Sequence, residues 1–95
     1  MTLYLYISTV SGNNDIRVKQ MRMQNILESK NVKFTPVDIA ADDEAKNKMI
    51  AALKAANKAP PYLAPQLFYG DEYIGGYDEF DEANENLCLD SFLRL

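Results

Sequence analysis

The sequence predicts an α/β fold in which a four-stranded mixed sheet is flanked by helices, with the element order βαβαββα. Three observations carry this prediction: a strand pattern at the start of the chain, two amphipathic helical segments on either side of a second strand, and a hairpin signal followed by further helix. A strand–helix–strand unit joins parallel strands through a right-handed crossover, whereas a hairpin adds antiparallel strands. Both kinds of pairing are therefore expected in one sheet.

The first strand is expected at residues 3–7, where Tyr and Ile favour β structure. The turn residues of the segment Ser11-Gly12-Asn13-Asn14 end it, and a helix follows from Asp15 to about Ser29. Asn14 is the expected N-cap, because its side chain can accept a hydrogen bond from the first turn. The apolar residues at roughly helical spacing, which we expect to face the core, are Val18, Met21, Ile26 and Leu27.

A second strand is expected at residues 32–39, on a sheet edge or at a bulge because Pro36 has no amide hydrogen. Asp42 and Asp43 open a second helix, which should stop near Asn57, ahead of Pro60-Pro61. Its apolar stripe consists of Ala45, Met49, Ile50, Leu53 and Ala56.

The third part of the chain has the signals of a hairpin. Residues 67–69 and 72–74 flank Gly70-Asp71, and Gly75-Gly76 is expected to break the second of these strands in a turn that needs positive φ. Residues 78–93 should form one or two helices whose inward residues are Phe80, Ala83, Leu87, Leu89, Phe92 and Leu93. This order of elements is that of a minimal thioredoxin fold.

Size and charge bound the possible functions. A chain of 95 residues can bury one core, so residues 1–95 should form a single domain. The net charge is −4 and eight of the fourteen acidic residues lie between Asp71 and Asp90, which argues against a nucleic-acid partner. No apolar run reaches the roughly 20 residues of a membrane span, and the first residues lack a basic leader. We expect a monomeric cytoplasmic protein, small enough to enter the nucleus.

The residue types exclude several chemistries. Dithiol exchange needs two thiols or a thiol with glutathione, and this chain has one cysteine, Cys88, for which we expect a half-buried structural role. It has no histidine, so Ser-His-Asp and Cys-His catalysis and the usual zinc sites are excluded. The acidic clusters near Asp42 and Asp78 are expected to be solvated helix starts. We therefore expect no enzyme and no metal site.

The segments Ala64-Pro65-Gln66-Leu67-Phe68 and Gly75-Gly76-Tyr77-Asp78-Glu79-Phe80 resemble the second half of a glutaredoxin, where a cis-proline and a Gly-Gly turn frame the glutathione site. Tyr6-Ile7-Ser8 and the segment from Ser11 to Asn14 stand where glutaredoxins carry Cys-x-x-Cys. With Val37-Asp38-Ile39-Ala40, essentially the whole chain is similar to the SH3-domain-binding glutamic-acid-rich-like proteins. The resemblance implies a non-catalytic, thioredoxin-like adaptor or modulator that binds a protein partner.

The resemblance also implies a partner-binding surface. Ser11 takes the place of the nucleophilic cysteine and Asn14 that of the resolving cysteine. The residues implied at this surface are Ser8, Ser11, Gly12, Asn13, Asn14, Ala64, Pro65, Gly75, Gly76, Tyr77 and Asp78. The alternative function is glutathione binding, or a weak glutathione-dependent oxidoreductase acting through Cys88. Affinity for glutathione should be weak or absent, because Ser8 replaces a lysine that often holds the glycyl carboxylate in glutaredoxins.

The family resemblance further predicts a proline-rich SH3 ligand near the cis-proline. A polyproline II ligand presents prolines on one edge every three residues, whereas Pro61 and Pro65 are four apart. We therefore do not expect SH3 binding through Pro60–Pro65. The segment is expected instead to stop the preceding helix and to deliver Pro65 to the sheet.

Overall fold

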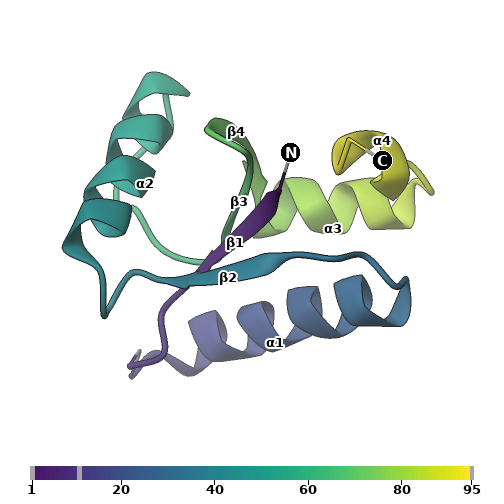
Figure 1. Cartoon of the computed structure of the whole chain (residues 1–95), viewed down its shortest axis with the longest axis horizontal. Coiled ribbons are helices and arrows are strands. Elements are labelled where there is room, and N and C mark those ends of the chain that lie inside the picture. The colour runs from purple at the N-terminus through teal and green to yellow at the C-terminus, as the bar shows by residue number, and fades with distance from the viewer. Residues whose placement is uncertain (1, 11, 95) are drawn as a thin grey trace.

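The computed structural model describes residues 2–10 and 12–94, and its elements follow the predicted βαβαββα order, with a second short helix at the end. Four strands form one mixed sheet in the order β2-β1-β3-β4 (Figure 1). The elements along the chain are β1 (Leu3–Ile7), α1 (Asn14–Ser29), β2 (Thr35–Asp38), α2 (Asp43–Ala55), β3 (Gln66–Tyr69), β4 (Glu72–Gly76), α3 (Tyr77–Glu85) and α4 (Leu89–Phe92). No helix in the described ranges is both long enough and apolar enough to cross a membrane.

Strand β1 is central and joins the two halves of the sheet. It pairs in parallel with β2, with Tyr4 opposite Thr35, and antiparallel with β3, with Leu5 opposite Leu67. Pro36 lies in β2 at the edge of the sheet, as predicted. Its missing amide hydrogen is tolerated there because an edge strand has a neighbour on one side only.

The two faces of the sheet are covered unequally. Alternate β1 residues point to opposite faces, so Leu3 and Leu5 pack with residues of α1, α3 and α4, while Tyr6 packs with residues of α2. Figure 1 shows α2 alone on its side of the sheet. The sheet face beneath α2 is therefore covered by a single described helix.

The structure corrects two predictions for α1. Its N-cap is Asn13 and not Asn14: the Asn13 side chain accepts a hydrogen bond from the Asp15 amide at 2.9 Å. Val18 and Met21 are not in the core but are 54% and 61% exposed. The buried face consists instead of Ile16, Gln20, Met23 and Leu27. Apolar residues occur on two sides of this helix, and packing against the sheet selects one of them.

The remaining differences lie at element ends. The second strand begins at Thr35 and not at residue 32, and Gly75-Gly76 does not break β4, which continues through Gly76. Of these two glycines, Gly75 has a positive φ, of 153°, and Gly76 does not. Leu87 is 93% exposed because it lies in the left-handed connection between α3 and α4, with φ 58°.

Three of the five residues in the predicted apolar stripe of α2 are buried. Asp42 caps the helix, and the buried residues are Ala45, Met49 and Leu53. Ile50 is half-buried and Ala56 is exposed, because each lies to one side of the line of contact with the sheet.

Candidate functional site

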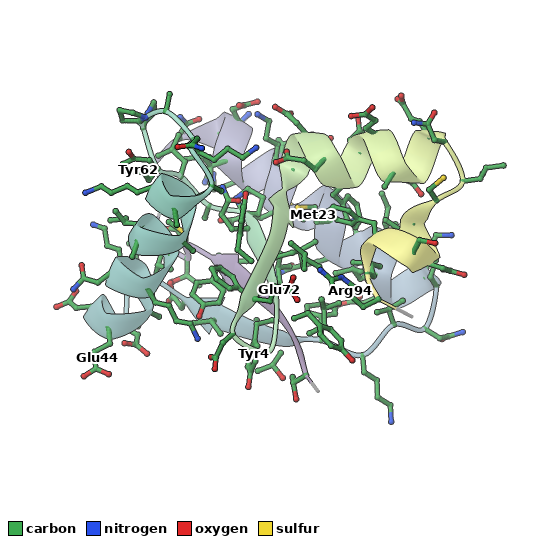
Figure 2. The ribbon with its side chains drawn as sticks, turned by 90° about the horizontal axis from the view of Figure 1, so that it is seen from above. Tyr4, Met23, Glu44, Tyr62, Glu72 and Arg94 are labelled. Carbon is green, nitrogen blue, oxygen red and sulfur yellow. The ribbon has the colours of Figure 1, made fainter. Side chains whose placement is uncertain are left out.

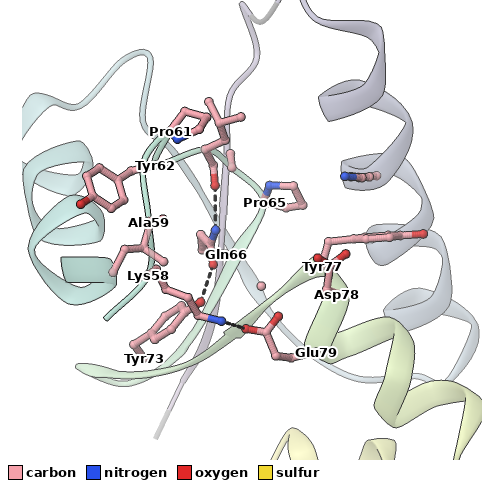
Figure 3. A pocket seen from close by; sticks show the side chains of 15 residues that line it. Lys58, Ala59, Pro61, Tyr62, Pro65, Gln66, Tyr73, Tyr77, Asp78 and Glu79 are labelled. Atoms are coloured by element: carbon pink, nitrogen blue, oxygen red, sulfur yellow. Dashed lines mark hydrogen bonds and ion pairs between the residues drawn. The ribbon is translucent and has the colours of Figure 1, made fainter. Parts of the chain in front are cut away.

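A pocket of about 230 Å³ lies where the loop after α2 meets the starts of β3 and α3. The loop contributes Pro61, Tyr62 and Leu63, and the first residues of α3 form the opposite wall (Figure 3). Pro65 lies between these two walls, after a cis peptide bond to Ala64. The cis-proline implied by the glutaredoxin resemblance is therefore present, together with a second cis bond between Pro60 and Pro61.

A chain of hydrogen bonds holds the loop against the hairpin. The Tyr73 hydroxyl donates to Oε1 of Gln66 at 2.8 Å, and Nε2 of Gln66 donates to the Leu63 carbonyl at 2.7 Å (Figure 3). Burial raises the pKa of Tyr73 well above its ordinary value, so its hydroxyl remains a neutral donor. Gly76 lies beside this chain, and a Cβ there would lie 2.7 Å from Oε1 of Gln66, so a side chain would have to displace the Gln66 amide.

Charges of both signs line the pocket and balance one another. Lys58 forms an ion pair with Glu79 in the first turn of α3. Lys19 reaches across from α1, with its Nζ 3.1 Å from Asp15 and 5.4 Å from the centre of the Tyr77 ring. Burial alone would raise the pKa of Glu79, but hydrogen bonds from Lys58 and from backbone amides outweigh it and leave that pKa lowered. Glu79 is therefore a stable carboxylate partner for Lys58.

The structure brings together the predicted residues of the second half of the chain. Those that line the pocket are Ala64, Pro65, Gly76, Tyr77 and Asp78. Gly75 is not among them: a Cβ there would lie 2.8 Å from Cζ of Phe92, so it faces the helical layer of α4.

The predicted residues of the first loop do not line the pocket. Asn13 caps α1 and Asn14 begins it, and a Cβ on Gly12 would meet no described atom within 4 Å apart from its chain neighbours. The Ser8 backbone exchanges two hydrogen bonds with the Gln20 side chain, at 2.8 and 3.2 Å. Ser11 lies outside the described residues.

Sequence reasoning missed several lining residues. Gln66 and Glu79 stand inside the two quoted motifs, so adjacency could have suggested them. Lys19 is in α1, Lys58 in the loop after α2 and Tyr73 in β4, and no sequence motif around any of the three indicates a binding site. Only the folded chain brings them to one place.

Cys88 is exposed, which corrects the half-buried position expected for it. Its Sγ lies 3.3 Å from the Asn86 carbonyl, beyond the C-terminal end of α3, whereas the pocket is at the N-terminal end. Nine helical residues separate these ends, a rise of about 13 Å. A ligand seated beside Pro65 is therefore remote from this thiol. Among residues 2–10 and 12–94, no three acidic, histidine or cysteine side chains cluster as metal ligands would.

The sheet order, the cis-proline and the helix that starts directly after Gly76 define a glutaredoxin-like fold. The family described as "SH3-binding, glutamic acid-rich protein" matches residues 1–95, and the chain belongs to it. A Drosophila melanogaster protein named "SH3 domain-binding glutamic acid-rich protein homolog" is 40% identical over 103 residues. That alignment takes in the whole of this chain but 65% of the fly protein, so the chain is shorter than this relative.

Solved structures show the same fold. The C. albicans actin interacting protein Aip5 superposes with a TM-score of 0.77 and 29% identity, covering 97% of this chain and 87% of Aip5. A buckwheat glutaredoxin in complex with glutathione superposes with a TM-score of 0.70, covering 97% of this chain and 76% of that protein. At 17% sequence identity, the similarity to this glutaredoxin shows a shared fold and nothing more.

Proposed function

We propose that this chain is a non-catalytic glutaredoxin-like protein, an adaptor or modulator that binds a protein partner at the pocket beside Pro65. One observation carries the proposal: the pocket keeps its cis-proline loop and helix start, while its lining residues include no cysteine. The chain has no histidine and one cysteine, which lies beyond the far end of α3. The frame of a glutaredoxin site is retained without the group that does its chemistry.

The backbone at Ala64 suits an extended peptide. Ala64 lines the pocket and is 5% exposed, yet its amide and carbonyl make no hydrogen bond with another residue in the described ranges. Buried backbone groups are nearly always paired, so a partner strand that pairs with them would gain main-chain hydrogen bonds. Tyr62 and Tyr77 flank the position and offer ring surface to the side chains of that strand.

The relatives support a binding role over a catalytic one. The fly relative is named for binding SH3 domains and Aip5 for interacting with actin, and both are named for a protein partner. For this chain we propose a protein partner without adopting either name. The four-residue spacing of Pro61 and Pro65 remains our reason not to place an SH3 domain on this segment.

Site-specific photo-crosslinking tests the proposal. A benzophenone amino acid would replace Tyr77 in the full chain, and in a control it would replace Glu28, an exposed residue of α1 away from the pocket. A protein crosslinked through position 77 and not through position 28 is then titrated into the ¹⁵N-labelled chain. Chemical-shift changes around Pro65 and Tyr77 are expected. Changes confined to another face of the molecule would refute the pocket as the binding surface.

The glutathione alternative is tested separately. Calorimetric titration with reduced glutathione should give no saturable heat, because Ser8 stands in place of the expected lysine. The lysines that do line the pocket, Lys19 and Lys58, are already paired with Asp15 and Glu79. An assay for reduction of a glutathione mixed disulfide should give the same background rate for the wild type and for Cys88→Ser. A rate that the substitution abolishes would make the protein an oxidoreductase and overturn the proposal.

A further inference from the structure

A second groove lies under α2, on the face of the sheet that this helix covers alone. It has a volume of about 400 Å³ and shares no lining residue with the pocket beside Pro65. We call it the tyrosine groove; the residues used below are Tyr4, Tyr6, Asp42, Glu44, Lys48 and Asp71. Figure 2 shows Tyr4 and Glu44 along the same lower edge of the view, Glu44 at the start of α2. The lining residues come from β1, β2, the first part of α2 with its cap, and the hairpin turn at Asp71.

Tyr6 places an unpartnered hydroxyl in this groove. The residue is 5% exposed and its ring packs on Phe68, with 4.5 Å between ring centres. No residue in the described ranges forms a hydrogen bond with its hydroxyl, and no side-chain polar atom there is both fully buried and unpaired. The hydroxyl is therefore the part of Tyr6 that opens into the groove. Because this hydroxyl is open to the groove and has no hydrogen-bond partner in the described ranges, it is available to a ligand.

The lining of the groove carries an excess of negative charge, with Asp42, Glu44 and Asp71 against Lys48, although Lys48 is the charged group that acts most strongly on the Tyr6 hydroxyl. Lys48 pairs with Asp71 at 2.6 Å, so these two charges offset each other. Asp42 uses Oδ1 to cap α2 and has a second oxygen available, and Glu44 makes no ion pair with another described residue. Two carboxylates therefore remain at the mouth of the groove, where they favour a cation.

Tyr4 adds a ring face to these polar groups. Tyr4 lies two residues before Tyr6, on the same side of β1, and is half-buried. A planar cation can stack on such a ring while its N–H groups point outward. A guanidinium fits this combination better than an ammonium, because its donors form a rigid fork and its face is weakly hydrated.

We propose that the tyrosine groove binds an arginine side chain of a protein partner. The guanidinium lies on the Tyr4 ring, donates a hydrogen bond to the Tyr6 hydroxyl oxygen, and pairs with Glu44 and the free oxygen of Asp42. This site is independent of the pocket beside Pro65, because the two share no residue and lie on different parts of the surface. A partner could occupy either one without the other.

NMR titration of the ¹⁵N-labelled full chain tests the site with N-acetylargininamide as the probe. Saturable shift changes are expected at Tyr4, Tyr6 and Ala45, with a dissociation constant in the millimolar range typical of a single side chain. N-acetylcitrullinamide has nearly the same shape without the charge and should cause no saturable change. Equal shifts from the two probes, no saturation, or shifts centred on Pro65 would each overturn the proposal.

Two substitutions and one control sharpen the test. Glu44→Gln should weaken binding of the arginine probe by roughly threefold or more, since it removes one carboxylate of the pair. Tyr6→Phe removes the hydroxyl and keeps the ring, and should weaken binding to a similar degree; if it unfolds the chain, Glu44→Gln decides alone. Glu82→Gln removes an exposed carboxylate on α3 and should leave binding unchanged. Equal weakening by Glu82→Gln would reduce the effect to overall charge and refute a built site.

Discussion

The Tyr73 hydroxyl on β4 lies 2.8 Å from Oε1 of Gln66 on β3, and through Gln66 it holds the carbonyl of Leu63. The hairpin thereby fixes the loop that carries Pro65. Tyr73→Phe removes the first donor of this chain and should lower the free energy of unfolding by about 1 kcal/mol, the usual worth of one hydrogen bond. Chemical denaturation of the wild type and the variant measures this difference in the free energy of unfolding. Tyr69→Phe, whose hydroxyl has no partner in the described ranges, should change stability by only a few tenths of that amount.

Gly75 is expected to tolerate no side chain. Its φ is 153°, and a Cβ there would lie 2.8 Å from Cζ of Phe92 and 3.1 Å from Cβ of Glu79. Gly75→Ala should therefore destabilise the fold by about 1–3 kcal/mol through backbone strain and overpacking. Gly12→Ala is the matched control, because a Cβ at that position would have no described atom within 4 Å apart from those of its chain neighbours. If thermal unfolding shows the same midpoint for both variants, the close packing of Gly75 on α4 is wrong.

Two adjacent asparagines at the start of α1 have different roles: Asn13 is the N-cap and Asn14 is the first helical residue. Asn13 accepts the Asp15 amide at the helix start, so Asn13→Ala should cost about 1 kcal/mol of stability. Asn14→Ala should cost less, because Asn14 already has helical backbone and its side chain accepts only a long bond from Arg17, at 3.4 Å. Urea denaturation of the two variants checks the order. The reverse order would restore Asn14 as the cap.

Asp38 links the end of β2 to the loop after β1 and gives a pH dependence. A hydrogen bond from the Thr9 hydroxyl is the main cause that lowers the pKa of Asp38, helped by the amides of Ala40 and Thr9. Because the folded pKa is depressed, the stabilisation is present above the ordinary aspartate pKa and is lost as pH falls through the folded value. Thr9→Ala should raise the pKa of Asp38 toward its ordinary range, as ¹³C NMR of the carboxyl carbon would show.

The matching control keeps the hydroxyl. Thr9→Ser should leave the pKa of Asp38 lowered, and the stability difference between Thr9→Ala and the wild type should shrink in acid, once Asp38 is protonated in both. A difference that persists unchanged at the lowest pH would assign the effect of Thr9 to packing.

Local chemistry accounts for the parts of this protein that the sequence predicted well. β1, α2, the hairpin and the parallel and antiparallel pairing follow from residue periodicity, from Asp42 as a cap and from the turn at Gly70. Because Pro36 lacks an amide hydrogen, it restricted its strand to a sheet edge or a bulge, and the strand lies at the edge. These features depend on neighbours in sequence, so sequence suffices for them.

The core face of α1 could not be predicted in this way. Val18 and Met21 are as apolar as the residues that are buried, and a helix pattern cannot say which of two apolar sides will meet the sheet. The gathering of Lys19, Lys58 and Tyr73 beside Pro65 depends in the same way on how α1, the loop and the hairpin pack.

The sequence by itself determined what this chain lacks and what frame it keeps: one cysteine, no histidine, and a glutaredoxin-like order of elements with Pro65 before the hairpin. Composition and local pattern are enough for both, since a missing reactive group cannot be supplied by folding. Only the tertiary structure decided where the surfaces lie. It separated Cys88 from the pocket by the length of α3, and it left the Tyr6 hydroxyl open beneath α2, because one helix covers that face of the sheet.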